Sequence, residues 1–227
     1  KHHDYNPVKV EGWGNDWVIY PVDGYGNHEI IRSLLQKEKP DALWFMTDPR
    51  FYEWLWEIEN EVRANVPMIY YHVWDNFPYP HFNGKFYRSN DKVVCISKVT
   101  KEILDNVAPD TDSEYLPHAV HSDVFRPISN DQERRLTKDL RNKILDQCEF
   151  KNPNKKIFFW NNRNARRKQS GTVLWWFKEW LDKVGHDKAM LVMHTDAQDP
   201  HGQDLPHLIQ HLDLQGEVLL STQKVSP

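Results

Sequence analysis

Residues 155–171 read KKIFFWNNRNARRKQSG, a hydrophobic run followed directly by a cluster of positive charge. The run at 157–160 is short and aromatic, which is typical of a buried strand, and we expect a strand at 156–161. Apolar residues then recur at helical spacing, which predicts a helix at 171–184. The basic residues between Arg163 and Lys168 therefore lie on a strand-to-helix turn.

This turn has the features of an anion site. In a parallel α/β sheet such a turn lies at the carboxyl edge of the strands, where ligands bind. The following helix presents free backbone N–H groups and the positive end of its dipole at the same place. Arginine and lysine side chains there favour a dianion, most simply a phosphate or pyrophosphate. A basic turn that is merely solvated is the alternative.

The composition bounds the class of protein. The chain has 227 residues, 27% charged and 39% hydrophobic, which fits a globular protein of one large or two small domains. A net charge of -4 argues against a general nucleic-acid binder. The apolar runs are too short for a transmembrane helix, and no signal peptide is visible. Cys95 and Cys148 make no disulfide framework, so we expect a cytoplasmic protein.

Strand and helix patterns alternate along the chain. Strands are expected at 17–22, 42–46, 68–73, 92–96, 114–116, 156–161, 189–193 and 217–220. Helices are expected at 28–38 after an Asn27 cap, at 50–65, after a Ser97 cap, along the charged segment 136–148, at 171–184 and at 204–213. Residues 1–16 and 74–84 are expected to be irregular, and 118–130 to be a linker.

This alternation predicts parallel sheets with right-handed crossovers. We infer an α/β fold of two Rossmann-like domains, 1–127 and 128–227, that face each other across a cleft. The second domain has about three strand–helix units, which is short for a doubly wound domain, so we expect it to be incomplete and the chain to be an internal piece of a longer protein. No G-x-G-x-x-G follows the first strand, and the usual dinucleotide fingerprint is absent.

Four segments, taken in order, resemble glycosyltransferase family 4, a group of retaining enzymes with the GT-B fold. They are a strand ending in histidine, MIYYHVWDN at 68–76; NDKVVCISKVTKE at 90–102; LPHAVHSDVFRP at 116–127; and the strand followed by Arg163 and Lys168. The order and spacing match from about residue 41 to residue 221. The resemblance implies two facing Rossmann-like domains and transfer of a sugar from a nucleotide-sugar, with retention and without a metal ion.

The chain departs from the family pattern at several positions. The glycines expected beside the arginine and the lysine are Asn162 and Gln169, and Ala119 and His121 replace a glycine and an aspartate. The family's glutamate motif, which contacts the donor sugar and ribose, would lie beyond Pro227. The resemblance therefore implies that the chain alone lacks part of its donor site and can be inactive.

By the resemblance, Arg163 and Lys168 hold the donor diphosphate, whose negative charge grows as it leaves. Asn162 and Thr222 are further candidate substrate contacts. Arg166 and Arg167 are expected to be flanking charges or contacts to an acidic acceptor. The donor is itself a substrate, so no cofactor is expected.

In the first domain the resemblance makes His72 and Asp75 the candidate catalytic residues. His72 is expected at a strand end facing the cleft, near the transferred sugar; a hydrogen-bonded structural histidine is the alternative. Asp75 and Asn76 follow on the loop and are candidate contacts to sugar hydroxyls, or turn residues. The aromatic residues of this loop form either an acceptor platform or the packing of the loop: Trp74, Phe77 and Tyr79.

A polar loop near the end of the chain invites a metal interpretation, but its spacing is irregular and we expect no metal site. Its members are His194, Asp196, Asp199, His201 and Asp204. Two other functions stay open: a nucleotide-sugar 2-epimerase of the same architecture, which would need carboxylates placed for proton abstraction, and a nucleic-acid-binding module built on the basic turn. The acceptor, whether glycan, lipid or protein, is not predicted, and peripheral contact with a membrane is left open.

Overall fold

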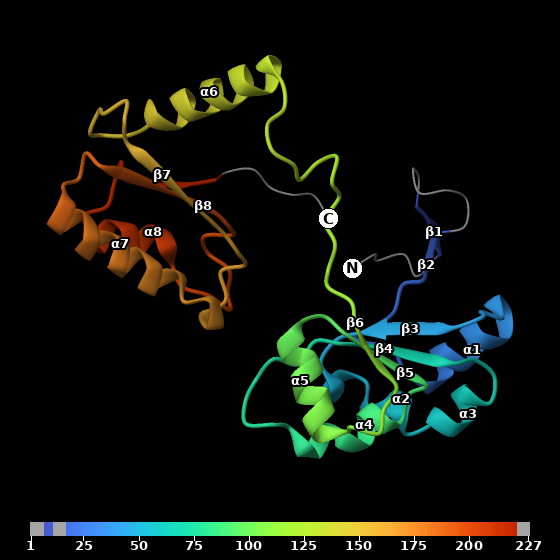
Figure 1. The fold of residues 1–227 in the computed structure, drawn as a ribbon. Helices are drawn as coiled ribbons and strands as arrows, with labels where there is room; N and C mark the ends of the chain where they lie inside the picture. The colour runs from blue at the N-terminus through green and yellow to red at the C-terminus, as the bar shows by residue number, and fades with distance from the viewer. Residues whose placement is uncertain (1–6, 11–16, 222–227) are drawn as a thin grey trace. The chain divides into compact units, whose positions relative to one another are not determined.

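A computed structural model of the chain describes residues 7–10 and 17–221 (Figure 1). The chain divides into two compact units, Lys1–Phe125 and Arg126–Pro227, which we call unit 1 and unit 2. No helix within the described residues is long and apolar enough to cross a membrane.

Unit 1 contains a four-stranded parallel sheet whose strands follow one another in chain order. The strands are β3 (Leu43–Met46), β4 (Met68–His72), β5 (Lys92–Cys95) and β6 (Ser113–Tyr115). The helices are α1 (His28–Glu38), α2 (Glu53–Trp56), α3 (Glu59–Arg63), α4 (Gly84–Arg88) and α5 (Lys98–Val107), with 3₁₀ turns at Pro49–Phe51 and His81–Asn83. A separate antiparallel pair is formed by β1 (Val8–Lys9) and β2 (Val18–Ile19).

The predicted helix caps are confirmed. The side-chain oxygen of Asn27 accepts a hydrogen bond from the N–H of Ile30 at 3.0 Å, and that of Ser97 accepts from the N–H of Thr100 at 3.1 Å. Each cap satisfies a backbone donor that the first helical turn leaves without a partner.

The prediction of one continuous helix at 50–65 is wrong, because the segment folds as a 3₁₀ turn and the two short helices α2 and α3. Trp56 explains the break. Its ring stacks on Phe86 at 4.8 Å, and its indole N–H donates to Asn90 at 3.2 Å. Tertiary packing of this large side chain outweighs the helical periodicity on which the prediction rested.

Three other predicted segments differ from the structure. Within 1–16, which was expected to be irregular, Val8–Lys9 forms the strand β1. The loop expected at 74–84 ends in the 3₁₀ turn His81–Asn83, which leads directly into α4. Among the described residues of 17–22, only Val18–Ile19 is a strand, because it pairs with β1 instead of joining the parallel sheet.

The core of unit 1 lies on one face of its sheet. Alternate strand residues, among them Phe45, Tyr70 and Val93, are buried in one cluster with residues of the helices. On the other face, Trp44 and Met46 of β3 are 52% and 47% exposed. The helices therefore cover one side of the sheet. This is expected because the strands follow one another in chain order and crossovers between parallel strands are right-handed.

Unit 2 contains a three-stranded parallel sheet in the order β7 (Lys156–Asn161), β8 (Ala189–His194), β9 (Val218–Leu220). Its helices are α6 (Asp131–Leu145), α7 (Ser170–Val184) and α8 (Leu205–His211), with a 3₁₀ turn at Arg166–Lys168. In Figure 1, α7 and α8 lie on one side of the sheet and α6 on the other. The prediction of two α/β units with parallel sheets is confirmed.

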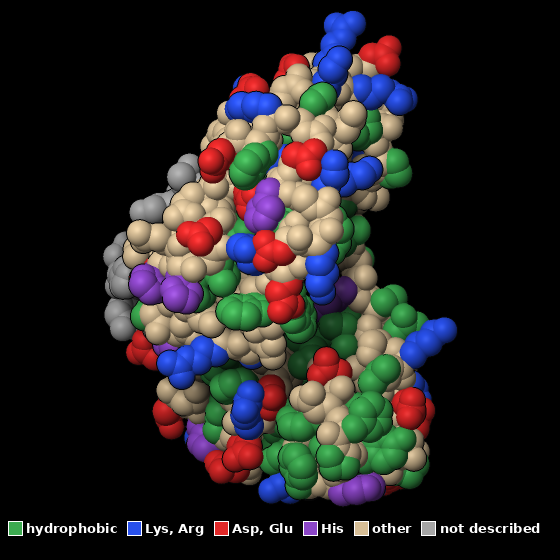
Figure 2. Space-filling model, turned by 90° about the vertical axis from the view of Figure 1, so that its left-hand side faces the viewer, with side chains coloured by type: hydrophobic (Ala, Val, Ile, Leu, Met, Phe, Trp, Pro, Cys, Tyr) green, Lys and Arg blue, Asp and Glu red, His purple; other side chains and the backbone are tan. Residues whose placement is uncertain are grey.

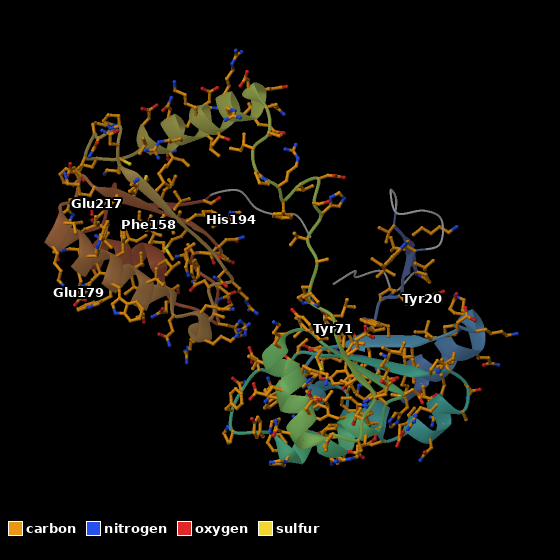
Figure 3. All side chains as sticks on the ribbon, viewed as in Figure 1. Tyr20, Tyr71, Phe158, Glu179, His194 and Glu217 are labelled. Carbon is orange, nitrogen blue, oxygen red and sulfur yellow. The ribbon has the colours of Figure 1, made fainter. Side chains whose placement is uncertain are left out.

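Side-chain contacts agree with these layers. The ring centroid of Phe158 of β7 (labelled in Figure 3) lies 6.2 Å from that of Phe177 of α7. Met190 of β8 instead contacts the thiol of Cys148, which follows α6. Among the described residues β7 pairs only with β8, so its other edge carries no strand. A mostly aromatic groove of about 390 Å³ lies beside it, between β7 and α7, and Phe159 and Trp176 of its lining are 66% and 63% exposed.

At the start of α6, the carboxylate of Glu133 is held by several hydrogen-bond donors, and their effect on its pKa can be tested. The guanidinium of Arg126 donates two hydrogen bonds to the carboxylate of Glu133, at 2.6 and 3.1 Å, and the N–H of Ser129 donates a third at 2.9 Å. These donors, Arg126 foremost, lower the pKa of Glu133 from 4.5 to about 2. A lowered carboxyl pKa means that the pair stabilises the fold above pH 4.5, and that this stabilisation is lost as the pH falls towards 2.

We therefore expect the side-chain carboxyl carbon of Glu133 to titrate near pH 2 by NMR. The Arg126→Gln variant should raise this midpoint towards 4.5, because the principal donor is lost. Arg134→Gln is the matched control: Arg134 pairs with Asp131 at 3.6 Å on the same helix and should leave Glu133 unchanged. A midpoint near 4.5 in the unmodified chain would contradict the pairing.

Candidate functional site

The basic turn connects the carboxyl end of β7 to the start of α7, as predicted. Asn162 is half-buried directly after the strand, Arg163 is exposed, and Lys168 is half-buried at the end of the 3₁₀ turn. Gln169 then adopts a left-handed conformation, with φ of 52°, and α7 begins at Ser170. The turn thus brings Arg163 and Lys168 to the edge of the sheet at which α/β proteins bind ligands.

Arg163 is held by the polar loop that follows β8. Its guanidinium donates to the carboxylate of Asp199 from Nε at 2.7 Å and from Nη2 at 3.3 Å, and Nη2 lies 3.2 Å from Nδ1 of His201. Asp199 also accepts from the N–H of His201 at 2.8 Å. Arg163, and then this backbone bond, hold the pKa of Asp199 far below its usual range. A ligand anion at Arg163 therefore competes with an internal carboxylate.

Asn164 joins the turn to the same loop. It is fully buried; its amide donates to the carbonyl of Gln203 at 2.7 Å, and its oxygen accepts from the Ser170 hydroxyl at 2.7 Å. Gly202 packs so closely that a Cβ there would lie 2.0 Å from the carbonyl oxygen of Asn164, so only glycine fits. This network fixes the position of the basic turn.

The start of α7 is less open than the sequence suggests. The N–H of Gly171 donates to the side chain of Gln203 at 2.7 Å, so this donor already has a partner. An anion that uses this N–H must displace the Gln203 side chain. Sequence reasoning missed Asn164 and Gln203, and the glycine at Gly202 was the only local sign of close packing.

The residues of the polar loop do not converge on one point. Asp199 and His201 face Arg163, Asp204 caps α8 by accepting from the N–H of His207, and His194 lies 3.0 Å from Ser221. Figure 3 shows His194 at the end of the sheet away from Glu217. In the described part of the chain, no group of three candidate ligands is placed to hold a metal ion. Thr222 lies outside the described residues.

In unit 1, His72 lies at the end of β4, as predicted, but its side chain is 0% exposed and hydrogen-bonded, as in the structural alternative. Nε2 lies 2.9 Å from the hydroxyl of Tyr87, and Nδ1 has no hydrogen-bond partner in the structure as described. Burial lowers the pKa of His72 from 6.5 to about 3, so the imidazole is neutral at physiological pH. The physical reason is α4, whose Tyr87 covers the end of β4.

Asp75 and Asn76 are exposed on the loop after β4. The carbonyl of Asn76 accepts from the indole N–H of Trp74 at 3.1 Å, which orders the loop. Of the candidate catalytic pair, therefore, Asp75 is accessible to a ligand and His72 is not. A role for either in catalysis stays a prediction.

No family model matches the chain, and no curated protein matches it significantly. Among solved structures it is similar to a glycosyltransferase from Rickettsia africae, with 19% identity, a TM-score of 0.57 and coverage of 85% of this chain and 49% of that chain. It is also similar to the E. coli trehalose-6-phosphate structure bound with UDP-2-fluoro glucose, with 11% identity, a TM-score of 0.57 and coverage of 87% and 51%.

A third similar structure is an α,α-trehalose-phosphate synthase (UDP-forming) from Burkholderia xenovorans in complex with glucose-6-phosphate. It shares 10% identity with this chain, with a TM-score of 0.57 and coverage of 87% of this chain and 52% of that chain. The chain thus spans about half the length of the solved structures that it matches. At these identities the likeness shows the fold alone, and membership of family 4 stays a prediction. The chain has an α/β fold with parallel sheets that matches GT-B glycosyltransferases.

Proposed function

We propose that this chain belongs to a glycosyltransferase that transfers a sugar from a nucleoside-diphosphate sugar to an acceptor, with retention of anomeric configuration and without a metal ion. The observation that carries the proposal is the placement of Arg163 and Lys168 between β7 and α7 in a chain with this fold. The similar structures support the substrate class, since one is a UDP-forming synthase and another is bound with UDP-2-fluoro glucose. A cytoplasmic location belongs to the same proposal.

The chemistry requires cations at this position. As the bond between the sugar and the diphosphate breaks, negative charge grows on the departing phosphate oxygen, and a fixed guanidinium and ammonium stabilise it. Arg163 offers a planar pair of N–H donors, whereas Lys168 supplies a single compact charge. Asp75 and Asn76, both exposed after β4, are the candidates for contacts to sugar hydroxyls, and half-buried Asn162 is a further candidate substrate contact.

Thermal-shift measurements with UDP, UDP-glucose, pyrophosphate and uridine test this proposal. A ligand that binds only the folded chain raises its melting temperature. We expect UDP and UDP-glucose to stabilise the chain, pyrophosphate to do so more weakly, and uridine to have little effect, because it lacks the phosphates. The UDP shift should persist in EDTA. A shift that needs Mg²⁺ would overturn the metal-independent part, and no shift with any phosphate ligand would overturn the donor site.

A further inference from the structure

A chain of buried polar side chains lies beneath the carboxyl end of the unit 1 sheet. Nε2 of His72 is 2.9 Å from the hydroxyl of Tyr87, and the same hydroxyl lies 3.4 Å from the amide nitrogen of Asn83. The three side chains are at most 3% exposed, within a core that is otherwise mainly aromatic and aliphatic. Buried polar groups are costly unless they are paired. These hydrogen bonds therefore hold the side chain of Asn83, the last of the three, in a defined orientation.

Asn83 lines a pocket of about 280 Å³, which we call the Trp74 pocket. Its walls come from segments that follow β3 and β4, the edge of the sheet at which α/β proteins bind ligands. The volume suits one monosaccharide-sized ring. Its lining includes Asp48, Arg50, Glu53, Trp74, Phe82 and Asn83.

The pocket combines aromatic faces with hydrogen-bonding groups. Trp74 and Phe82 meet edge to face, with ring centroids 5.8 Å apart, and Phe82 is 68% exposed. Figure 2 shows hydrophobic side chains gathered on this face of unit 1, in the lower part of the view. An exposed ring and a half-buried ring beside carboxylates suit a ligand with both C–H faces and hydroxyl groups, which is the surface of a sugar.

The charges in the pocket balance one another. Arg50 forms an ion pair with Asp48 at 3.3 Å, and the ammonium of Lys85 lies 4.6 Å from the centre of the Phe86 ring. Glu53 adds a second carboxylate. Since each cation already has an anionic or aromatic partner, the pocket gives little attraction to a phosphate.

We propose that the Trp74 pocket binds the ring of an uncharged hexose and not a sugar phosphate, and that Asn83 is its orienting amide. That this hexose is the acceptor rests on the proposed function, whereas binding of the sugar does not. Of the aromatic residues in the loop after β4, Trp74 would contact the sugar. Phe77 and Tyr79 lie outside the lining of the pocket.

NMR of the ¹⁵N-labelled chain tests the proposal. The indole N–H signal of Trp74 is assigned from its loss in the Trp74→Phe variant, and methyl α-D-glucopyranoside and glucose 6-phosphate are titrated separately at constant ionic strength. We expect saturable shifts of this signal with the neutral sugar in the millimolar range, and no tighter binding of the phosphate. Phe82→Ala, at an exposed position, should weaken binding at least about fivefold, because one aromatic wall is lost. Tyr87→Phe, which cuts the link from His72 to Asn83, should weaken it about twofold to fivefold.

Trp176→Ala, at an exposed tryptophan of unit 2, is the control and should leave sugar binding unchanged. Glucose 6-phosphate binding tenfold tighter than the neutral sugar, no shift of the Trp74 signal, or equal losses in Trp176→Ala and Phe82→Ala would each overturn the assignment. UDP binding is measured on the same samples by calorimetry. If the unmodified chain binds the sugar but not UDP, the result counts against the proposed function alone. If it binds UDP but not the sugar, the result counts against the pocket alone.

Discussion

Replacing His72 with alanine is expected to lower the free energy of unfolding of unit 1 by about 2–4 kcal/mol. The imidazole is fully buried and packs against the rings of Tyr87 and Tyr70, at centroid distances of 4.6 and 5.8 Å. Its removal leaves a cavity and takes a hydrogen-bond partner from the Tyr87 hydroxyl. Urea unfolding, followed through the NMR signals of β4 and β5, measures the loss. His121→Ala, at an exposed histidine of unit 1, should change stability little.

The same variant should alter the pH dependence of stability. The folded pKa of His72 is about 3 and its ordinary value is 6.5, so below pH 6.5 the unfolded chain takes up a proton that the folded chain does not. This difference costs the unmodified chain up to about 1.4 kcal/mol per pH unit as the pH falls from 6.5 towards 3. The alanine variant lacks this contribution, and its curve should be flatter over that window. Equal slopes in the two proteins would show that His72 is not held neutral.

The burial of His72 shows where reasoning from the sequence ends. The pattern MIYYH predicts a strand, and the strand is there with most of its residues buried. A polar residue at the end of a strand is expected to be accessible unless another element of the fold covers it. The cover is α4, a five-residue helix that is too short to show a helical period in the sequence.

The contacts of the basic turn were hidden for a different reason. Arg163 and Asp199 are 36 residues apart, and Asn164 and Gln203 are 39 apart, so no local pattern joins them. Read alone, the polar loop resembles an irregular set of metal ligands. Its carboxylate instead pairs with an arginine that the fold brings beside it. The position of the turn followed from the strand–helix alternation, because that alternation determines which edge of the sheet a loop occupies.

Arg163→Ala and Lys168→Ala are each expected to weaken UDP binding about tenfold or more, while uridine binds both variants and the unmodified chain alike. Each change removes a charge-assisted contact to the diphosphate. Arg167→Ala is the control, because this exposed arginine lies on the same 3₁₀ turn but outside the spacing that the family resemblance assigns to the diphosphate. Calorimetric titration with UDP and uridine compares the variants. Equal losses in all three would indicate a diffuse basic patch.

The Asp199→Asn variant tests whether Arg163 itself binds the diphosphate of UDP. The asparagine keeps the size of the side chain but removes the negative charge that holds Arg163 at 2.7 Å. If Arg163 turns to the diphosphate, this variant should bind UDP about twofold to tenfold more tightly, because the competing carboxylate is gone. The double variant Asp199→Asn, Arg163→Ala should lose that gain completely, since the released guanidinium is its only source. Tighter binding that survives in the double variant would mean that Asp199 repels UDP directly, and weaker binding in the single variant would mean that Asp199 positions Arg163 for the ligand instead of competing with it.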